Sequence, residues 1–131
     1  MNDAVALDKI SVVKEMMLAA VKSRQRIPYR QLYEVMKPYE EHEVIYYTLE
    51  HACKELVPRE DAILEAMLYT KNNRLPASGF FSIYRNVRYR EFVDQFGNVH
   101  EMALSDEDKE QITKWELKRI ADYFSDSPYL Y

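Results

Sequence analysis

Lys71-Asn72-Asn73-Arg74-Leu75-Pro76-Ala77-Ser78-Gly79 is the stretch of this 131-residue chain that is richest in turn-forming residues. Asparagine, proline, serine and glycine each favour turns for a separate steric or hydrogen-bonding reason. The preceding segment, Ala62–Thr70, is compatible with a short helix or with a buried strand, and we favour the strand. The following segment, Phe80–Arg90, is dense in the aromatic and β-branched residues typical of strands. Together the three segments predict a strand, a long loop and a second strand.

Three helices are expected before these strands. Apolar residues at three- and four-residue steps predict a helix from Ala4 to about Arg24. It should end before Ile27-Pro28, because the residue before a proline is pushed into extended conformation. The same spacing predicts a second helix from about Tyr29 to Met36 and a third from about Glu43 to Leu56, each followed closely by a proline.

The C-terminal third of the chain predicts a hairpin and a long helix. Residues 90–93 and 99–102 read as short strands, because a turn containing Gly97 separates them. Ser105 followed three residues later by Asp108 is close to a capping box, the pattern that begins a helix. We expect this last helix to run to about Phe124.

The segments Ile27-Pro28-Tyr29-Arg30-Gln31-Leu32-Tyr33 and Lys71–Phe81 resemble winged-helix modules of bacterial and phage proteins, over about residues 4–85. The tyrosine-led second helix also resembles the winged-helix domain of DNA alkyltransferases, but the Pro-Cys-His-Arg motif of that family is absent, so alkyl transfer is not supported. The resemblance implies an α+β fold with a winged-helix-like three-helix core, an antiparallel β-hairpin meander and a long C-terminal helix. The expected organisation is one domain, 1–131, with a core at 4–85, an extra hairpin at 86–104, a helix at 105–124 and a tail at 125–131.

Composition excludes several classes of protein. Hydrophobic residues make up 47% of the chain and charged residues 31%, as in ordinary folded domains. The two glycines, Gly79 and Gly97, are too few for the glycine-rich loops that hold nucleotide phosphates. Neither a disulfide nor a paired-cysteine zinc site is expected, since Cys53 is the single cysteine. With no apolar run long enough to span a membrane, we expect a cytoplasmic protein without a cofactor.

No constellation in the sequence favours catalysis or metal binding. His42 and His51 are too far apart for a one-turn pair of metal ligands. Cys53 and His51, two residues apart on a helix, should point to different sides, so a thiol with its base is not expected. The acidic groups lie at helix beginnings and links, where negative charge offsets the helix dipole. We therefore expect a non-catalytic protein.

The charges are unevenly distributed along the chain. The net charge is −4, yet residues 66–90 carry five basic residues and no acidic one, which leaves −9 for the rest. A second basic run contains Lys22, Arg24, Arg26 and Arg30. If both runs lie at one edge they would attract phosphates, so we predict a nucleic-acid-binding module, with DNA as partner, or a small regulator. The alternative is that the intervening aromatic residues enter the core and the bases only face solvent. The candidate nucleic-acid contacts are Arg26, Arg30, Tyr46, Tyr47, Lys71, Asn72, Asn73, Arg74, Arg85, Arg88 and Arg90.

A protein partner is the second hypothesis. The outward face of the third helix should show Tyr46 and Tyr47 between glutamates, which suits a protein contact better than base reading, unless one tyrosine packs inward. Such a protein would be an inhibitor or adaptor of a phage or mobile element, or a homodimer formed through the C-terminal helix. The candidate interface residues are Trp115, Tyr123, Phe124, Tyr129 and Tyr131.

Overall fold

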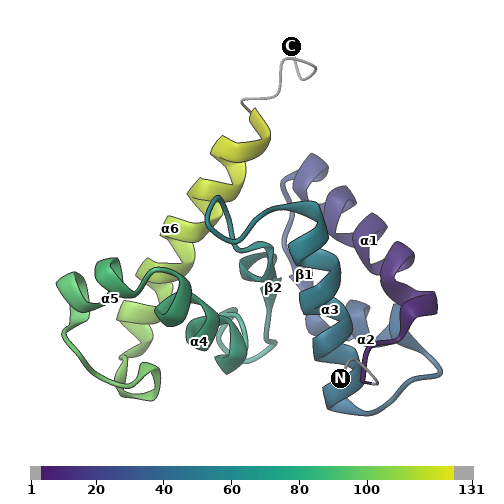
Figure 1. Ribbon diagram of the computed structural model, residues 1–131, viewed down its shortest axis with the longest axis horizontal. Coiled ribbons are helices and arrows are strands. Elements are labelled where there is room, and N and C mark those ends of the chain that lie inside the picture. The colour runs from purple at the N-terminus through teal and green to yellow at the C-terminus, as the bar shows by residue number, and fades with distance from the viewer. Residues whose placement is uncertain (1–3, 126–131) are drawn as a thin grey trace.

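The computed structural model describes residues 4–125, and these form a mainly helical protein (Figure 1). Two very short strands pair between the helices, and the long last helix crosses the other elements. In chain order the elements are η1 (Leu7–Lys9), α1 (Ile10–Ser23), β1 (Ile27–Pro28), α2 (Tyr29–Met36), α3 (His42–Leu56), η2 (Leu64–Met67), β2 (Leu68–Tyr69), α4 (Ser78–Val87), α5 (Tyr89–Phe96), η3 (Glu101–Ala103) and α6 (Asp106–Ser125), where η marks a 3-10 turn.

The winged-helix prediction is wrong. Across residues 4–125 the one sheet is the two-stranded pairing of β1 with β2, which is parallel, with Ile27 opposite Leu68 and Pro28 opposite Tyr69. A winged helix needs an antiparallel hairpin formed by neighbouring segments of the chain. Here the two strands belong to segments about forty residues apart, with α2 and α3 between them.

The segment Phe80–Arg90, expected as a strand, instead contains most of α4 and the start of α5. Phe80, Phe81 and Tyr84 are all buried, and the steps of one and three residues between them fit one side of a helix. The Phe80 and Phe81 rings meet edge to face at 5.0 Å, and Phe80 lies 6.4 Å from Tyr84. Packing of these rings outweighs their average preference for strands.

The second predicted hairpin is also wrong. Residues 90–93 lie within α5, and residues 101–103 form the 3-10 turn η3. The rings of Phe92 and Phe96, one helical turn apart, lie 5.4 Å from each other, and Phe96 lies 6.2 Å from Trp115 of α6. Gly97 ends α5 with a φ of 84°, a left-handed conformation that glycine adopts without steric cost.

The first three helices and the last helix confirm the sequence predictions. The second has the predicted bounds, and α3 and α6 match theirs to within one residue, whereas α1 begins at Ile10, six residues after the predicted start at Ala4. At the start of α6 the Asp108 N–H donates to the Ser105 hydroxyl at 3.0 Å, and the Ser105 N–H donates to the Asp108 carboxylate at 3.4 Å. This is the reciprocal capping that the spacing of the two residues predicts.

The centre of the protein is the segment from Ala62 to Leu68, in which every residue is buried. It contains η2, which packs against α1, α3 and α6. The predicted burial is confirmed, whereas the strand predicted over Ala62–Thr70 is reduced to Leu68 and Tyr69. A segment covered by helices on several sides has no neighbouring strand to extend a sheet.

Within the described residues, none of the helices combines the length and the apolar character that crossing a membrane requires.

Candidate functional site

The pairing of β1 with β2 joins two stretches of sequence that contain no acidic residue. The first lies between Glu15 and Glu34, and the second between Glu65 and Glu91. Each strand lies inside one of these stretches, so the pairing brings the basic residues nearest to the two strands in sequence to one junction. We call this surface the arginine edge and define it as Lys22, Arg24, Arg26, Arg30, Lys71 and Arg74.

Arg26 connects the two halves of the arginine edge. One terminal nitrogen of its guanidinium donates to the Arg74 carbonyl oxygen at 2.8 Å. The other donates to the carbonyl oxygens of Ala66 and Leu68, at 3.2 and 3.1 Å. Three backbone acceptors across the junction are thereby held by one side chain. Arg26 thus has a structural role, although the sequence predicted it as a nucleic-acid contact.

Two arginines share the ring of Tyr69. The guanidinium carbon of Arg74 lies 4.6 Å from the ring centroid and that of Arg26 lies 5.4 Å from it, which are cation–π distances. Burial lowers the pKa of Arg26, and the nearby positive charge of Arg74 lowers that pKa further. The same geometry that holds the two cations together therefore makes the site favourable for an anion.

The loop that carries Lys71 and Arg74 is fixed at both of its ends. The Thr70 N–H donates to the Leu75 carbonyl at 2.8 Å, and the Asn73 side-chain oxygen accepts from the Thr70 hydroxyl and the Leu75 N–H at 2.8 and 3.1 Å. Beyond the loop, the Ala77 N–H donates to the Tyr29 hydroxyl at 2.9 Å. Asn73 therefore stabilises the loop, whereas Asn72, the other predicted contact, is exposed.

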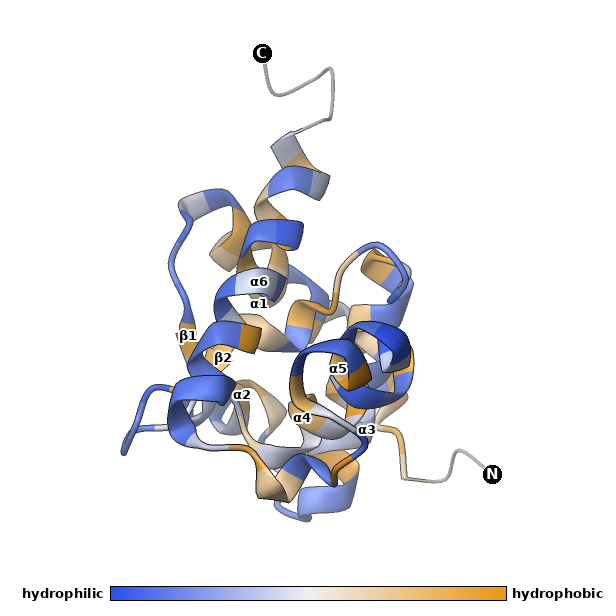
Figure 2. Ribbon diagram, turned by 90° about the vertical axis from the view of Figure 1, so that its left-hand side faces the viewer, coloured by the Kyte–Doolittle hydropathy of each residue, from blue (hydrophilic) through white to orange (hydrophobic). Residues whose placement is uncertain are grey.

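No carboxylate within residues 4–125 forms an ion pair with any of the six cations of the arginine edge. All of them except Arg26 are exposed. Figure 2 shows the ribbon that leads into β1 as a hydrophilic stretch on the outside of the molecule. The edge thus presents positive charge to solvent in a protein whose net charge is −4.

The structure does not bring the other three predicted arginines to this edge. Arg85 donates to the Val99 carbonyl at 2.8 Å and to the Asn98 side chain at 3.2 Å. Arg90 is exposed on α5, which Figure 1 places at the far end of the molecule from α1 and α2. Their charges are therefore spread over other surfaces.

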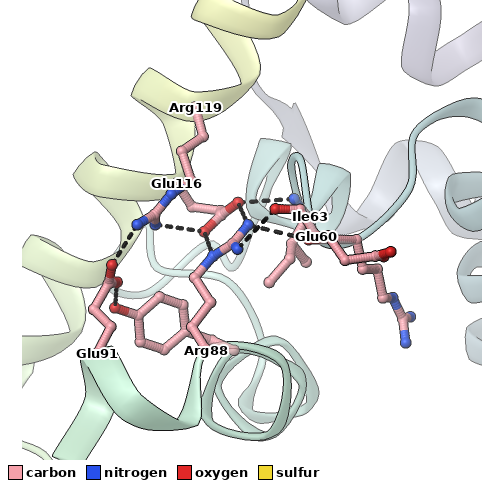
Figure 3. A network of polar contacts seen from close by, with 8 residues as sticks. Glu60, Ile63, Arg88, Glu91, Glu116 and Arg119 are labelled. Atoms are coloured by element: carbon pink, nitrogen blue, oxygen red, sulfur yellow. Dashed lines mark hydrogen bonds and ion pairs between the residues drawn. The ribbon is translucent and has the colours of Figure 1, made fainter.

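Arg88 is part of a largely buried polar network (Figure 3). It forms two hydrogen bonds with the Glu116 carboxylate, at 2.9 and 2.7 Å, and donates to the Glu60 and Arg59 carbonyls, each at 3.1 Å. Glu116 also accepts from the Ile63 N–H at 2.8 Å and from Arg119 at 3.1 Å. Arg119 extends the network to Glu91, which in turn accepts from the Tyr84 hydroxyl. With its charge neutralised, Arg88 serves to hold α6 against the centre of the protein.

Tyr46 and Tyr47 of α3 separate into two environments. Tyr46 is half-buried, its hydroxyl lies 2.7 Å from that of Tyr33, and its ring meets Tyr29 edge to face at 6.1 Å. Burial raises the pKa of Tyr46, and the hydrogen bond with Tyr33 adds to the effect. Tyr47 is 46% exposed. The alternative in which one of the two tyrosines packs inward therefore describes the structure.

The predicted protein interface lies partly on an open pocket between α5 and α6. The pocket has a volume of about 410 Å³ and is lined by Glu91, Gln95, Trp115, Lys118, Arg119 and Asp122. Tyr123, on the same helix, is 38% exposed, and its ring lies 5.2 Å from that of Phe124. Tyr129 and Tyr131 lie outside the described residues.

The sequence did not indicate which residues position the arginine edge. These are Tyr29 and Thr70, whose hydroxyls bond to the loop region, and Tyr69, whose ring contacts both Arg26 and Arg74. The two acid-free stretches were the available signal, but nothing in their composition says that they pair. Within the part of the chain described here, no group of three or more histidine, cysteine, aspartate or glutamate side chains could hold a metal ion.

Comparison with protein-family models, with curated protein sequences and with solved structures gives no significant match to this chain.

Proposed function

We propose that this protein binds the phosphate backbone of a nucleic acid through the arginine edge. The observation that supports it is the parallel pairing of β1 with β2, which joins two acid-free stretches and, with them, the six basic residues nearest to the two strands in sequence. Arginine and lysine side chains without carboxylate partners attract phosphates over long range. The bonds that close the loop between Thr70 and Leu75 hold the backbone that carries its two cations.

Contact with the backbone fits this surface better than reading of base edges. The exposed residues of α3 include Glu43, Tyr47 and Lys54. Base readout uses arginine, asparagine or glutamine in bidentate contacts. We therefore expect binding with little dependence on nucleotide sequence.

The test is a fluorescence anisotropy titration with random-sequence single-stranded and duplex DNA. If four cations contact phosphates, the slope of log affinity against log salt concentration should be about −3 on single strands. This corresponds to a loss of roughly fifty-fold between about 50 and 200 mM salt. Equal affinity at the two salt concentrations, or no binding at the lower one, would contradict the proposal.

A matched pair of charge reversals locates the binding surface. Lys71→Glu and Arg90→Glu each replace one exposed cation by an anion, so the two variants have the same net charge. We expect Lys71→Glu to weaken binding about tenfold or more at low salt, while Arg90→Glu, at the far end of the molecule, changes it little. Equal losses in both variants would point to net charge rather than to the arginine edge.

A second candidate function is self-association through the face formed by α5 and α6. It is favoured by the pocket lined by Trp115 and by the exposed ring of Tyr123, because tryptophan and tyrosine dominate binding energy at protein interfaces. Sedimentation equilibrium over a range of protein concentrations measures it directly. A monomer at all concentrations, or a dimer that Trp115→Ala leaves intact, would contradict this candidate.

A further inference from the structure

Two arginines of the arginine edge have a left-handed backbone. Arg24 has a φ of 56° and ψ of 39°, and Arg74 has a φ of 62°. Within residues 4–125 they are the only residues other than glycine with positive φ. A side chain that begins with a Cβ is disfavoured in this conformation, and glycine or asparagine is the usual occupant.

The left-handed conformation of Arg24 has a clear local cause. Arg24 follows the last residue of α1, and its N–H donates to the carbonyl oxygens of Ala20 and Val21. This is the ordinary way in which a helix ends, and glycine would satisfy it with less strain. The geometry of the turn therefore explains the backbone but not the choice of arginine.

Neither guanidinium is used by the fold for hydrogen bonding. In the part of the chain that the structure describes, the side chains of Arg24 and Arg74 form no hydrogen bond and no ion pair, although each guanidinium offers five N–H donors. Arg74 packs on the Tyr69 ring, and Arg24 is exposed. Two exposed arginines thus keep a disfavoured backbone conformation although the fold uses none of their side-chain donors.

The two left-handed turns lie at the same junction. Arg26, two residues after Arg24, donates directly to the carbonyl oxygen of Arg74. We propose that Arg24 and Arg74 are the principal phosphate-binding side chains of the edge and that they contact successive phosphates of a single-stranded nucleic acid. Arg26 is a positioning residue, since its terminal nitrogens are bonded to backbone carbonyls. This inference rests on the proposed nucleic-acid function and assigns the contacts within it.

Glycine substitutions test the proposal because affinity and stability should change in opposite directions. Arg24→Gly and Arg74→Gly should each weaken binding to a fluorescein-labelled oligothymidylate about fivefold and reduce the steepness of the salt dependence by about 0.7. Arg24→Gly should also raise the Tm by about 3 °C, as strain is removed from the turn. Arg74→Gly should unfold at or above the wild-type Tm, because the loss of its packing on Tyr69 offsets part of the gain.

Two control variants separate the effect of the positive charge from that of the backbone conformation. Arg24→Lys keeps the charge and the Cβ, so it should retain most of the affinity and the wild-type Tm. Arg90→Ala, on α5, should change neither quantity. If the wild-type protein binds and the glycine variants bind equally well, this assignment is wrong while the nucleic-acid proposal stands. If the wild-type protein does not bind the oligonucleotide, both are wrong. A fall in the Tm of Arg24→Gly would show that the arginine is retained for stability.

Discussion

Glu116 and Arg88 form a two-pronged ion pair with nitrogen–oxygen distances of 2.9 and 2.7 Å, and the Glu116 side chain is entirely buried. The pair joins the middle of α6 to the link between α4 and α5. Glu116 also accepts the Ile63 N–H, at the start of the buried central segment. Several elements that are distant in sequence therefore depend on a single carboxylate.

Removing the charge of Glu116 should be strongly destabilising. Glu116→Gln leaves the Arg88 guanidinium with an uncompensated charge in a mostly buried site, and breaking such pairs costs about 3–5 kcal/mol of unfolding free energy. Urea unfolding followed by circular dichroism measures the change. Glu110→Gln, on an exposed position of the same helix, is the control and should cost less than about 0.5 kcal/mol. Similar values for the two variants would contradict the role given to Glu116.

Replacing both partners should cost less than the two single changes together. In Arg88→Met with Glu116→Leu no buried charge remains without its partner, so the double variant should be more stable than the sum of the single losses predicts. A double-mutant cycle in urea provides the coupling free energy. Additive losses would mean that the two side chains act independently, contrary to their geometry.

Arg26 should matter for stability as well as for binding. Arg26→Met removes the donors of three backbone carbonyl oxygens at the junction of β1 and β2, and we expect a loss of about 2 kcal/mol. Arg30→Met removes an exposed arginine and should change the unfolding free energy by less than about 0.5 kcal/mol. Chemical unfolding of both variants tests the prediction, which a wild-type midpoint for Arg26→Met would contradict.

Tyr29 should make stability depend on pH in the alkaline range. Burial raises its pKa from 10.0 to about 12, so the folded state holds the proton more tightly than the unfolded state. The stabilisation that Tyr29 adds to the folded state is complete below pH 10. It is lost as the pH rises from there through the pKa of the folded state, about 12. Urea midpoints measured at a series of pH values below and above 10 should fall less steeply with rising pH in Tyr29→Phe than in the wild-type protein. Identical pH profiles would contradict the prediction.

Cys53 should be unreactive in the folded protein. It is buried, and burial raises the pKa of its thiol, which disfavours the thiolate that attacks disulfide reagents. We expect labelling by an aromatic disulfide to be limited by unfolding and to become fast in urea. Glutathione at the same pH provides the reference rate. Complete labelling of the native protein at that rate would show that the thiol is accessible.

The sequence was informative where a helix has one apolar face and a clear end. Pro28 predicts the end of the first helix, the regular apolar spacing predicts α1 and α3, and the pair Ser105 and Asp108 predicts the start of α6; the structure contains all of these features. The segment Ala62–Leu68 could not be assigned in the same way, since it is buried on all sides and such a run has no periodicity that separates a strand from a helical turn.

The prediction for the aromatic segment after Gly79 was wrong for a different reason. Its composition favours a strand, but the positions of Phe80, Phe81 and Tyr84 fit a helix, and the packing of those rings determines the outcome. At the candidate site, the basic runs were visible in the sequence. Their separation into an arginine edge and a buried network was not, because the partners of Arg26 and Arg88 lie 28 to 48 residues away along the chain.

The short pairing of β1 with β2 holds together segments whose side chains repel each other. Cations crowded at a contact only two residues long push the two segments apart whenever nothing neutralises them. Mobile anions of an inert salt will gather there and weaken this repulsion. Moderate ionic strength should therefore protect the backbone amide of Tyr69 from hydrogen exchange, even in the absence of any specific ligand.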